Sequence, residues 1–394
     1  MKGEKINKKI QNVGVVTGTR AEYGILKPLL LKIQEDEQLK LSLIVSGMHF
    51  LNEFGDTYKE IKKDGFSNFY KVKMYGSKES DKIYFHGFSL GNGISEFTKV
   101  LSKMKLDILL VFGDRLEAFA AACAAATLNI PLGHIHAGDK TDSGHIDEQL
   151  RFCISRFSHI LFAPTDKCKK RLIETCEQKF RVFNTGALGL DSVLKTDIIP
   201  EKKLEKNFKI DFKKPVAVVV FHPNILEHHN SGRDMEKILI SLKELDVQSI
   251  VIYPNNDIGS KKIINVIEKY SKDSFTRVFK NLDHDLFINL MQKASFMIGN
   301  SSSGVIEAPL LGLPVINVGI RNTGREHGCN VLYIKPKKEK IKSAVNKVLN
   351  DKKFLNEVKK CKNPYGTGNT SEKIVKILKK IDIDDKLLKK NINC

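Results

Sequence analysis

The chain has 394 residues, a length that usually corresponds to two domains. Apolar residues make up 41% and charged residues 28%, which is typical of a globular protein and excludes a disordered or collagen-like chain. Lys and Arg exceed Asp and Glu by 19, but no stretch interleaves aromatic residues with Arg, so nucleic-acid binding is not favoured. No apolar run approaches the roughly 20 residues that span a bilayer, and we find no export signal.

The cysteines indicate the cellular compartment. Seven are present, an odd number at irregular spacing without a Cys-x-x-Cys pair. This pattern argues against a disulfide framework and against a structural zinc site. Together with the missing export signal it predicts a reducing, cytoplasmic location.

The first half of the chain alternates short β-branched runs with helical patterns. We expect strands at residues 13–17, 41–45, 108–112, 131–135, 160–163 and 182–185. Helical patterns lie between them, at residues 21–34, 53–63, 88–103, 116–128, 146–155 and 167–176. Near-continuous apolar strands that alternate with helices predict a parallel sheet covered on both faces, as in a doubly wound α/β domain.

The alternation breaks at residues 194–215, a charged stretch with prolines that resembles a linker. It then resumes, with strands expected at residues 216–221, 249–253, 277–279, 296–298 and 314–318. The sequence therefore predicts an α/β fold with two Rossmann-like domains facing a cleft. We place the first domain at residues 1–195 and the second at 196–370, and we expect a helix within 371–394 that packs back on the first domain.

Charged residues follow the strands of the first half, where ligands bind in such sheets. These residues are Arg20 after the first strand, His49 after the second, Asp114 and Arg115 after the third, and His136 and Asp139 after the fourth, with Asp147 in the helix that follows. The turn at Arg20 lacks the GxGxxG pattern of dinucleotide sites but can still hold a phosphate. Converging titratable groups are typical of a catalytic site, although Asp114 alone also suits a helix N-cap.

The second half carries groups that suit a phosphate. Residues 299–304 read GNSSSG, and the three serines lie in a glycine-flanked strand-to-helix turn that offers hydroxyl and N–H groups. Glu307 lies one helical turn further and suits a sugar hydroxyl, whereas Arg321 and Arg325 can neutralise a phosphate. Further polar residues after strands are His222, Asn255 and Lys261.

The ordered set of motifs resembles the hydrolysing UDP-N-acetylglucosamine 2-epimerases of sialic-acid-type and legionaminic-acid-type biosynthesis. The matching motifs are GTRAEYG (18–24), SGMH (46–49), GDRLEA (113–118), HIHAGDKT (134–141), IDEQLRF (146–152), FHP (221–223), PNNDIGSK (254–261), GNSSSGVIEAP (299–309) and RNTGREHG (321–328). Each motif alone is weak, but together they run in the family's order from residue 18 to residue 328.

The resemblance implies a glycosyltransferase-B-type fold with the sugar on the first domain, UDP on the second, no cofactor, and a homo-oligomer. It implies catalytic roles for Asp114, Asp139 and Asp147, and the family often has Glu at the position of Asp139. Secondary candidates for contacts to sugar hydroxyls or for proton transfer are His49 and His136. The positions that would contact UDP are Arg20, Arg115, His222, Asn255, Lys261, Ser301, Ser302, Glu307 and Arg321.

The reaction implied by this resemblance is anti elimination of UDP to a 2-acetamidoglucal, followed by addition of water. From UDP-N-acetylglucosamine it would release free N-acetylmannosamine. It needs cations for the departing diphosphate and carboxylates to take and return protons. The same reaction on UDP- or GDP-linked N,N′-diacetylbacillosamine is an alternative, because no residue distinguishes the sugars.

Three other functions stay open at this stage. A metal-dependent hydrolase could use His134, His136, His145 and His222 with an Asp. A sugar-nucleotide glycosyltransferase would share the fold, and a non-catalytic or nucleic-acid-binding protein would account for the positive charge. Release of UDP and a free sugar, without metal or acceptor, separates these functions from the epimerase.

Overall fold

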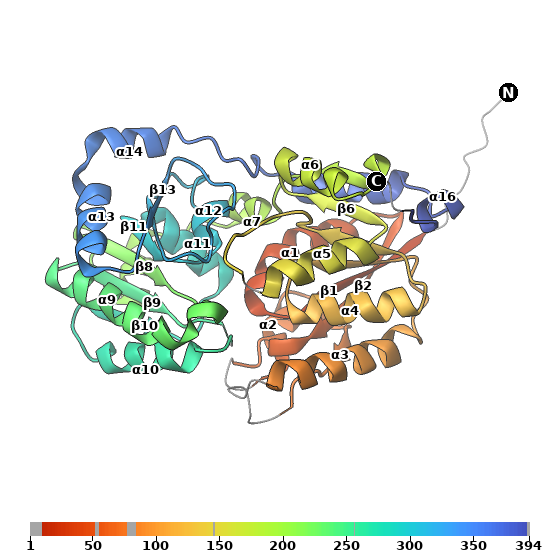
Figure 1. Ribbon diagram of the computed structural model, residues 1–394, viewed down its shortest axis with the longest axis horizontal. Coiled ribbons are helices and arrows are strands. Elements are labelled where there is room, and N and C mark those ends of the chain that lie inside the picture. The colour runs from red at the N-terminus through yellow and green to blue at the C-terminus, as the bar shows by residue number, and fades with distance from the viewer. Residues whose placement is uncertain (1–9, 52–54, 77–83, 145, 256, 392–394) are drawn as a thin grey trace.

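The computed structural model describes residues 10–51, 55–76, 84–144, 146–255 and 257–391. Within them the chain forms two parallel sheets flanked by helices (Figure 1). The seven-stranded sheet has the order β3-β2-β1-β4-β5-β6-β7, and the six-stranded sheet has the order β10-β9-β8-β11-β12-β13. The predicted α/β fold with two Rossmann-like units is therefore confirmed. We call the elements on the first sheet the N-terminal lobe and those on the second the C-terminal lobe.

The strands are short and mostly buried. Those of the N-terminal lobe are β1 (Gln11–Thr17), β2 (Leu39–Ser46), β3 (Tyr70–Val72), β4 (Ile108–Phe112), β5 (Leu132–Ile135), β6 (Ile160–Ala163) and β7 (Val182–Asn184). Those of the C-terminal lobe are β8 (Val216–Val220), β9 (Gln248–Ile252), β10 (Thr276–Phe279), β11 (Phe296–Gly299), β12 (Val315–Val318) and β13 (Val331–Ile334). Each strand pairs with its neighbours in parallel, so the carboxyl ends of all strands of a sheet meet at one edge.

Helices connect the strands and cover the sheets. In the N-terminal half of the chain they are α1 (Arg20–Gln34), α2 (Tyr58–Lys63), α3 (Phe85–Leu101), α4 (Leu116–Thr127), α5 (Ile146–Phe157), α6 (Asp166–Glu174) and α7 (Gly189–Lys195). Then follow α8 (Glu201–Phe208), α9 (Ser231–Glu244), α10 (Ser260–Tyr270), α11 (His284–Lys293), α12 (Ser303–Ile306), α13 (Lys338–Asn350), α14 (Lys352–Lys359), α15 (Thr370–Lys380) and α16 (Asp385–Leu388). No helix among the described residues is long and apolar enough to cross a membrane.

The first sheet has a different set of helices on each face. Val13 and Val15 of β1 belong to a buried cluster with apolar residues of α1 and α15. Val16 points to the other face and belongs to a cluster with residues of α3, α4 and α5. This alternation follows from the two-residue period of a strand, and it places α1 and α5 on opposite faces of the sheet.

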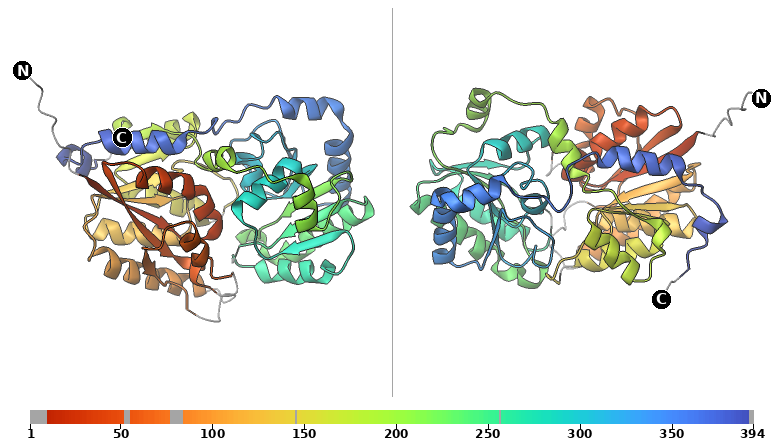
Figure 2. Two further views of the ribbon diagram at one scale, coloured as in Figure 1. Left: turned by 180° about the vertical axis from the view of Figure 1, so that it is seen from behind. Right: turned by 90° about the horizontal axis from the view of Figure 1, so that it is seen from above.

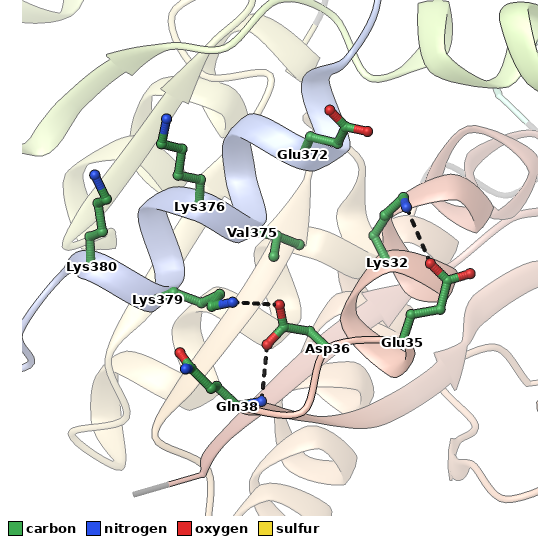
Figure 3. Close-up of a pocket in the computed structure, with 9 residues that line it drawn as sticks. All are labelled: Lys32, Glu35, Asp36, Gln38, Glu372, Val375, Lys376, Lys379 and Lys380. Carbon is green, nitrogen blue, oxygen red and sulfur yellow. Dashed lines mark hydrogen bonds and ion pairs between the residues drawn. The ribbon is translucent and has the colours of Figure 1, made fainter. Parts of the chain in front are cut away.

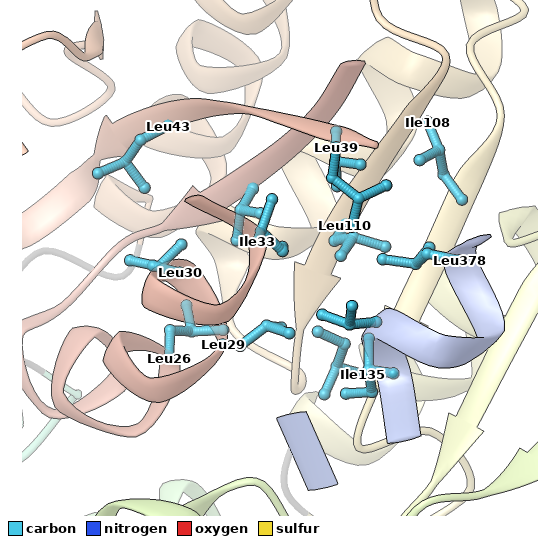
Figure 4. Close-up of a cluster of buried hydrophobic side chains, with 14 of the residues drawn as sticks. Leu26, Leu29, Leu30, Ile33, Leu39, Leu43, Ile108, Leu110, Ile135 and Leu378 are labelled. Atoms are coloured by element: carbon cyan, nitrogen blue, oxygen red, sulfur yellow. The ribbon is translucent and has the colours of Figure 1, made fainter. Parts of the chain in front are cut away.

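The helix α15 returns from the C-terminal lobe and lies beside α1 (Figure 2). Its residues Ile374 and Leu378 are buried in the same cluster as Leu26 and Leu29 of α1, and Figure 4 shows Leu378 among these side chains. Fully burying one such side chain stabilises the fold by roughly 1.5 to 3 kcal/mol. The chain therefore crosses between the lobes twice before it ends.

Polar contacts fix both ends of α15. The buried carboxylate of Asp191 on α7 accepts the backbone N–H groups of Thr370 (2.8 Å) and Ser371 (2.6 Å), which would otherwise lack partners at the helix start. Near the other end, Lys379 pairs with Asp36 at 2.8 Å. Figure 3 shows this pair in a groove of about 560 Å³ between α1 and α15, which contains none of the predicted site residues.

Three sequence expectations need correction. Residues 194–215 are not a plain linker, because α8 lies within them and buries Leu204 and Phe208, four residues apart, in the core of the C-terminal lobe. The strands β3 and β13 were not predicted. Cys176 takes part in a disulfide, contrary to the expectation from the cysteine spacing. Part of the helix expected at residues 53–63 lies outside the described residues, and α2 begins at Tyr58.

Candidate active site

A cavity of about 320 Å³ lies between the carboxyl ends of the two sheets. Both lobes line it, as expected for two doubly wound domains that face each other. The predicted site residues among its lining are Arg20, Asp114, Arg115, Asp147, His222, Asn255, Ser301, Ser302, Glu307 and Arg321. Four predicted residues, His49, His136, Asp139 and Lys261, are not part of this lining. We refer to this cavity as the cleft.

Asp114 is the first carboxylate at the cleft wall. It follows β4 and Gly113, whose φ of +70° turns the chain at the strand end. It forms an ion pair with the buried Arg151 of α5, and its side chain is 22% exposed. Burial alone would raise the pKa of Asp114, but Arg151 and Arg325 outweigh burial and lower it to about 2. Asp114 is therefore ionised at neutral pH and able to accept a proton.

Arg151 joins several groups behind the cleft. Its guanidinium also pairs with Glu148 at 2.8 Å and donates to the backbone oxygen of Asp139 at 3.0 Å. Asp147 precedes Glu148 in the first turn of α5 and lines the cleft itself. Residues of the motif at 146–152 therefore have different positions. Asp147 lines the cleft, whereas Glu148 and Arg151 form an ion pair behind Asp114.

Asp139 lies behind the wall and is almost fully buried. Its carboxylate contacts Arg325 of the C-terminal lobe at 2.8 Å and His136 at 3.3 Å. Burial opposes ionisation, but Arg325 and His136 hold the pKa of Asp139 well below its usual range. His136 has a left-handed backbone with φ of +67°, and its ring stacks on Tyr365. This group therefore joins the lobes and stays outside the cleft.

His49 is also set back from the cleft. Its ring is fully buried, with Nε2 3.1 Å from the hydroxyl of Thr17 and Nδ1 2.8 Å from the hydroxyl of Thr57. Burial lowers the pKa of His49 to about 3, so the imidazole is neutral. Thr57 itself lines the cleft. His49 can therefore influence the cleft through Thr57, which contacts its ring.

Two arginines enter the cleft from the N-terminal lobe. Arg20 pairs with Glu60 of α2 at 2.7 Å and reaches across to Asp283 of the C-terminal lobe. Arg115 lies 3.5 Å from Glu117 and 3.9 Å from Asp257. An anionic ligand in the cleft would compete with Asp283 for Arg20.

The serine turn lies on the opposite wall. It begins after Gly299, where a side chain is impossible because a Cβ would lie 1.9 Å from the backbone oxygen of Val220. The backbone N–H of Ser303 donates to the hydroxyl of Ser301 at 3.4 Å, which keeps the turn compact. Arg321 approaches the same turn and donates to the backbone oxygen of Asn300 at 3.5 Å. The wall thus offers hydroxyls and a guanidinium to an anion.

Glu307 closes this wall behind the serines. It is buried, and burial raises its pKa to about 7. The contact with Gly189 is close, because a Cβ at that glycine would lie 2.1 Å from the carboxylate of Glu307. A carboxyl group with this pKa can accept or donate a hydrogen bond near neutral pH.

His222 is oriented by its neighbours. Its ring Nδ1 accepts the backbone N–H of Asn255 at 3.1 Å, and its backbone exchanges two hydrogen bonds with the side chain of Asn300. These bonds fix the ring next to the serine turn. Lys261, in the first turn of α10, does not line the cleft.

The histidines proposed for a metal form no metal-binding group among the residues that the structure describes. The ring nitrogens of His134 contact the hydroxyl of Ser155 (2.9 Å) and the backbone oxygen of Gly113 (2.7 Å), so both are already engaged. Burial lowers the pKa of His134 to about 3. His145 lies outside the described residues, and the residues that are described hold no group of three or more His, Cys, Asp and Glu with metal-binding geometry.

Two acidic residues were not predicted as site residues. Glu22 lines the cleft from the first turn of α1, and Glu117 lies behind it in the first turn of α4. Both occur within motifs quoted above, GTRAEYG and GDRLEA. The signal that could have identified them is an acidic residue in the first turn of a helix that follows a strand end.

Comparison with known proteins identifies relatives along nearly the whole chain. Residues 31–379 match the family model for UDP-N-acetylglucosamine 2-epimerase. A hydrolysing UDP-N,N′-diacetylbacillosamine 2-epimerase of Legionella pneumophila is 33% identical over 97% of this chain and 99% of its own. The polysialic acid biosynthesis protein P7 of Escherichia coli is 34% identical over 92% of each chain.

The solved structures agree on the fold. The UDP-GlcNAc 2-epimerase of Neisseria meningitidis, bound to UDP-GlcNAc, superposes with a TM-score of 0.78 at 24% identity, covering 94% of this chain and all of its own. The enzyme of Methanocaldococcus jannaschii, in complex with UDP-GlcNAc and UDP, gives a TM-score of 0.76 at 24% identity over 94% of this chain and 99% of its own. The expected glycosyltransferase-B-type arrangement is thereby confirmed.

Proposed function

The chain belongs to the UDP-N-acetylglucosamine 2-epimerase family, and on that premise we propose that it is a hydrolysing 2-epimerase of a UDP-linked N-acetylhexosamine. It converts UDP-N-acetylglucosamine and water to N-acetylmannosamine and UDP, and so supplies nonulosonic acid synthesis. The observation that carries the proposal is the cleft, in which Asp114 and Asp147 of one lobe face the serine turn and Arg321 of the other.

The first half of the reaction is the elimination of UDP. The hydrogen on C2 of the sugar is only weakly acidic, and departure of UDP from C1 makes it far easier to remove. Preorganised cations and N–H or O–H donors stabilise the departing diphosphate. These groups come from Arg20, Arg115, Arg321, Ser301 and Ser302. When the substrate binds, the guanidinium of Arg20 leaves Asp283 and pairs with a phosphate oxygen.

A carboxylate accepts the C2 proton. Asp114 is ionised at neutral pH, as its lowered pKa requires, and Asp147 lines the same cleft. Asp139 contributes indirectly, from outside the cleft. Its ion pair with Arg325 holds residues 321–328 against the N-terminal lobe. His136 supports this ion pair by contacting Asp139, and His49 positions Thr57, which lines the cleft.

The lobes divide the substrate between them. We assign the sugar to residues 1–195 and UDP to residues 196–370, and α15 links the two lobes by packing back on the N-terminal lobe. His222, Asn255, Lys261 and Glu307 belong to the UDP side, Lys261 from outside the cleft wall. The reaction needs no cofactor, and we expect a homo-oligomer.

The names of two relatives favour a second substrate, N,N′-diacetylbacillosamine linked to UDP or GDP. The relative from Legionella pneumophila, named for UDP-N,N′-diacetylbacillosamine, matches 97% of this chain. A Campylobacter jejuni relative, 33% identical over 82% of this chain, is named for the GDP- and UDP-linked forms of the same sugar. The elimination and hydration steps are the same for these sugars.

The experiment incubates the protein separately with UDP-N-acetylglucosamine and with UDP- and GDP-N,N′-diacetylbacillosamine, and follows products by proton NMR. A hydrolysing epimerase releases nucleotide and a free, 2-epimerised sugar in equal amounts without an acceptor. A product that keeps its nucleotide would show a non-hydrolysing epimerase instead. Absence of turnover on all three substrates would contradict the proposal.

A further inference from the structure

The second half of the reaction needs an acid beside C2, whereas Asp114 at the cleft wall is ionised at neutral pH and acts as a base. We propose that Glu22 is this acid and gives its proton to C2 of the glucal intermediate. The inference rests on the proposed function, because it concerns the hydration step of the same reaction. It makes Glu22 a catalytic residue distinct from Asp114 and Asp147.

The position of Glu22 is fixed by the start of α1. Thr19 caps the helix and accepts the backbone N–H of Glu22 at 3.3 Å. The side chain of Glu22 folds back so that its Oε2 accepts the backbone N–H of Gly18 at 3.2 Å. Only 7% of the residue is exposed, and it lines the cleft together with Asp114 and Arg115. With Oε2 engaged as an acceptor, the proton of the acid resides on Oε1.

A second buried carboxylate keeps this proton in place. Glu117 lies between the ends of β1 and β2, so tightly that a Cβ at Gly18 or Gly47 would come within 2.7 Å of its side chain. Its Oε1 accepts the hydroxyl of Tyr75 at 2.9 Å, and its Oε2 lies 3.5 Å from Arg115. A neighbouring carboxylate disfavours ionisation of a buried carboxyl group, so Glu117 raises the pKa of Glu22.

The charged groups that face Glu22 are Glu117 on α4 and Asp114 and Arg115 after β4. Burial is the largest effect and Glu117 the next, and together they raise the pKa of Glu22 to about 8 against the opposing effects of Gly18 N–H and Arg115. Glu22 is therefore protonated at neutral pH, whereas Asp114 is ionised. Carboxyl groups in one site whose environments separate their pKa values are the usual basis for assigning an acid and a base.

Inversion at C2 needs the proton to leave on one face of the sugar and return on the other. Glu22 comes from α1, which packs on one face of the first sheet, and Asp147 comes from α5, which packs on the opposite face. Both side chains nevertheless line the same cleft. Their elements therefore approach the sugar from two directions, as inversion demands.

The step balances as follows. The O–H bond of Glu22 breaks and its proton forms the new C2–H bond of the glucal, while the oxygen of a water molecule bonds to C1. One proton of that water stays on the new C1 hydroxyl, and the other passes to Asp114 or Asp147, which has already released the C2 proton of the substrate to solvent. Glu22 regains a proton from solvent after the sugar leaves.

The test separates the two halves of the reaction in Glu22→Gln. We expect the variant to release UDP from the UDP-sugar and to accumulate the 2-acetamidoglucal, with formation of the free sugar reduced on the order of 10²- to 10⁴-fold. The matched control is Glu174→Gln, an exposed glutamate on α6, which should behave as the wild type. Circular dichroism and UDP binding establish that each variant is folded.

Two results would overturn the inference. One is a Glu22→Gln variant that hydrates added 2-acetamidoglucal, in the presence of UDP, as fast as the wild type. The other is an equal loss of elimination and hydration in a folded variant, which would make Glu22 a positioning residue. If the wild type itself forms no free sugar, the proposed function fails, and this result is distinct from both.

The wild type gives a test that does not depend on folding of a variant. Hydration of added glucal should fall as the pH rises through about 8, because Glu22 then loses its proton. Glu117→Gln removes the neighbouring negative charge and should move this fall to lower pH. A wild-type hydration rate that stays constant from about pH 7 to about pH 10 would contradict the inference.

Discussion

Replacing Asp114 by Asn removes a charge and a base while preserving shape. Burial raises the pKa of this carboxyl, but Arg151 and Arg325 outweigh burial and bring it from 3.8 to about 2. Since one pKa unit is about 1.4 kcal/mol, the ionised carboxylate contributes roughly 2 to 3 kcal/mol to folding at neutral pH. Because the folded pKa is lowered, this contribution is present above about pH 4 and is lost as the pH falls towards 2.

Asp114→Asn should therefore be less stable than the wild type at neutral pH, and the difference should disappear in acid. Turnover should fall on the order of 10²- to 10⁴-fold, because the amide cannot accept the C2 proton. UDP affinity should change little, since Asp114 pairs with Arg151 and not with the groups assigned to the diphosphate. The assays are chemical denaturation at several pH values, NMR of product formation, and calorimetric titration with UDP.

The control is Asp273→Asn, which removes a partly exposed aspartate, outside the cleft lining, that pairs with Lys243 at 2.7 Å. It should leave turnover unchanged. A folded Asp114→Asn variant with near-native turnover would refute the assignment of the base and would favour a purely structural role beside Arg151. A large loss of UDP affinity would refute the division of roles between the lobes.

Four further outcomes follow from the site. Ser302→Ala and Arg321→Ala should each weaken UDP binding by roughly 1.5 to 3 kcal/mol in calorimetry, because each removes a hydrogen bond to a charged group. UDP affinity should rise between about pH 6 and about pH 8 as Glu307, with its pKa of about 7, ionises and accepts a sugar hydroxyl, and Glu307→Gln should abolish this dependence. Asp191→Ala should lower the thermal unfolding temperature, since two buried N–H groups of α15 lose a charged acceptor. EDTA should leave turnover unchanged, because the proposed steps use no metal.

Controls and contrary results are specific to each variant. Ser271→Ala changes a partly buried serine at the end of α10, outside the cleft lining, and should not affect UDP binding. Unchanged UDP affinity in both Ser302→Ala and Arg321→Ala would remove the nucleotide from the C-terminal lobe. An unchanged unfolding temperature for Asp191→Ala would show that α15 does not depend on its cap, and activity lost to EDTA and restored by zinc would favour the metal-dependent hydrolase.

Sequence periodicity was sufficient to predict the central strands of each sheet but did not predict the edge strands β3 and β13. The strands β4 and β8 are continuous apolar runs, because both faces of each sheet are covered by helices. The edge strand β3 has three residues, two of them exposed, so it carries no apolar run. The helix α8 lies among lysines, and only Leu204 and Phe208 mark its buried side.

The candidate site was predictable in part, because residues after strands of a parallel sheet meet at one edge. This rule selects Asp114, Ser301 and Arg321, which line the cleft. The same rule does not predict which of the residues after a strand points into the cleft. Asp139 follows a strand as well, yet Arg325 draws it behind the wall. The raised pKa of Glu22 comes from burial first and from the charge of Glu117 second, and no local sequence pattern reveals either effect.

The measurement that tests the central claim most directly is the reaction in deuterium oxide, followed by proton NMR of the released sugar. Elimination removes the C2 hydrogen and hydration replaces it from solvent, so the account predicts deuterium at C2 of the free, epimerised sugar in every turnover. A 2-epimerised product that keeps its original C2 hydrogen would contradict elimination and hydration in this cleft.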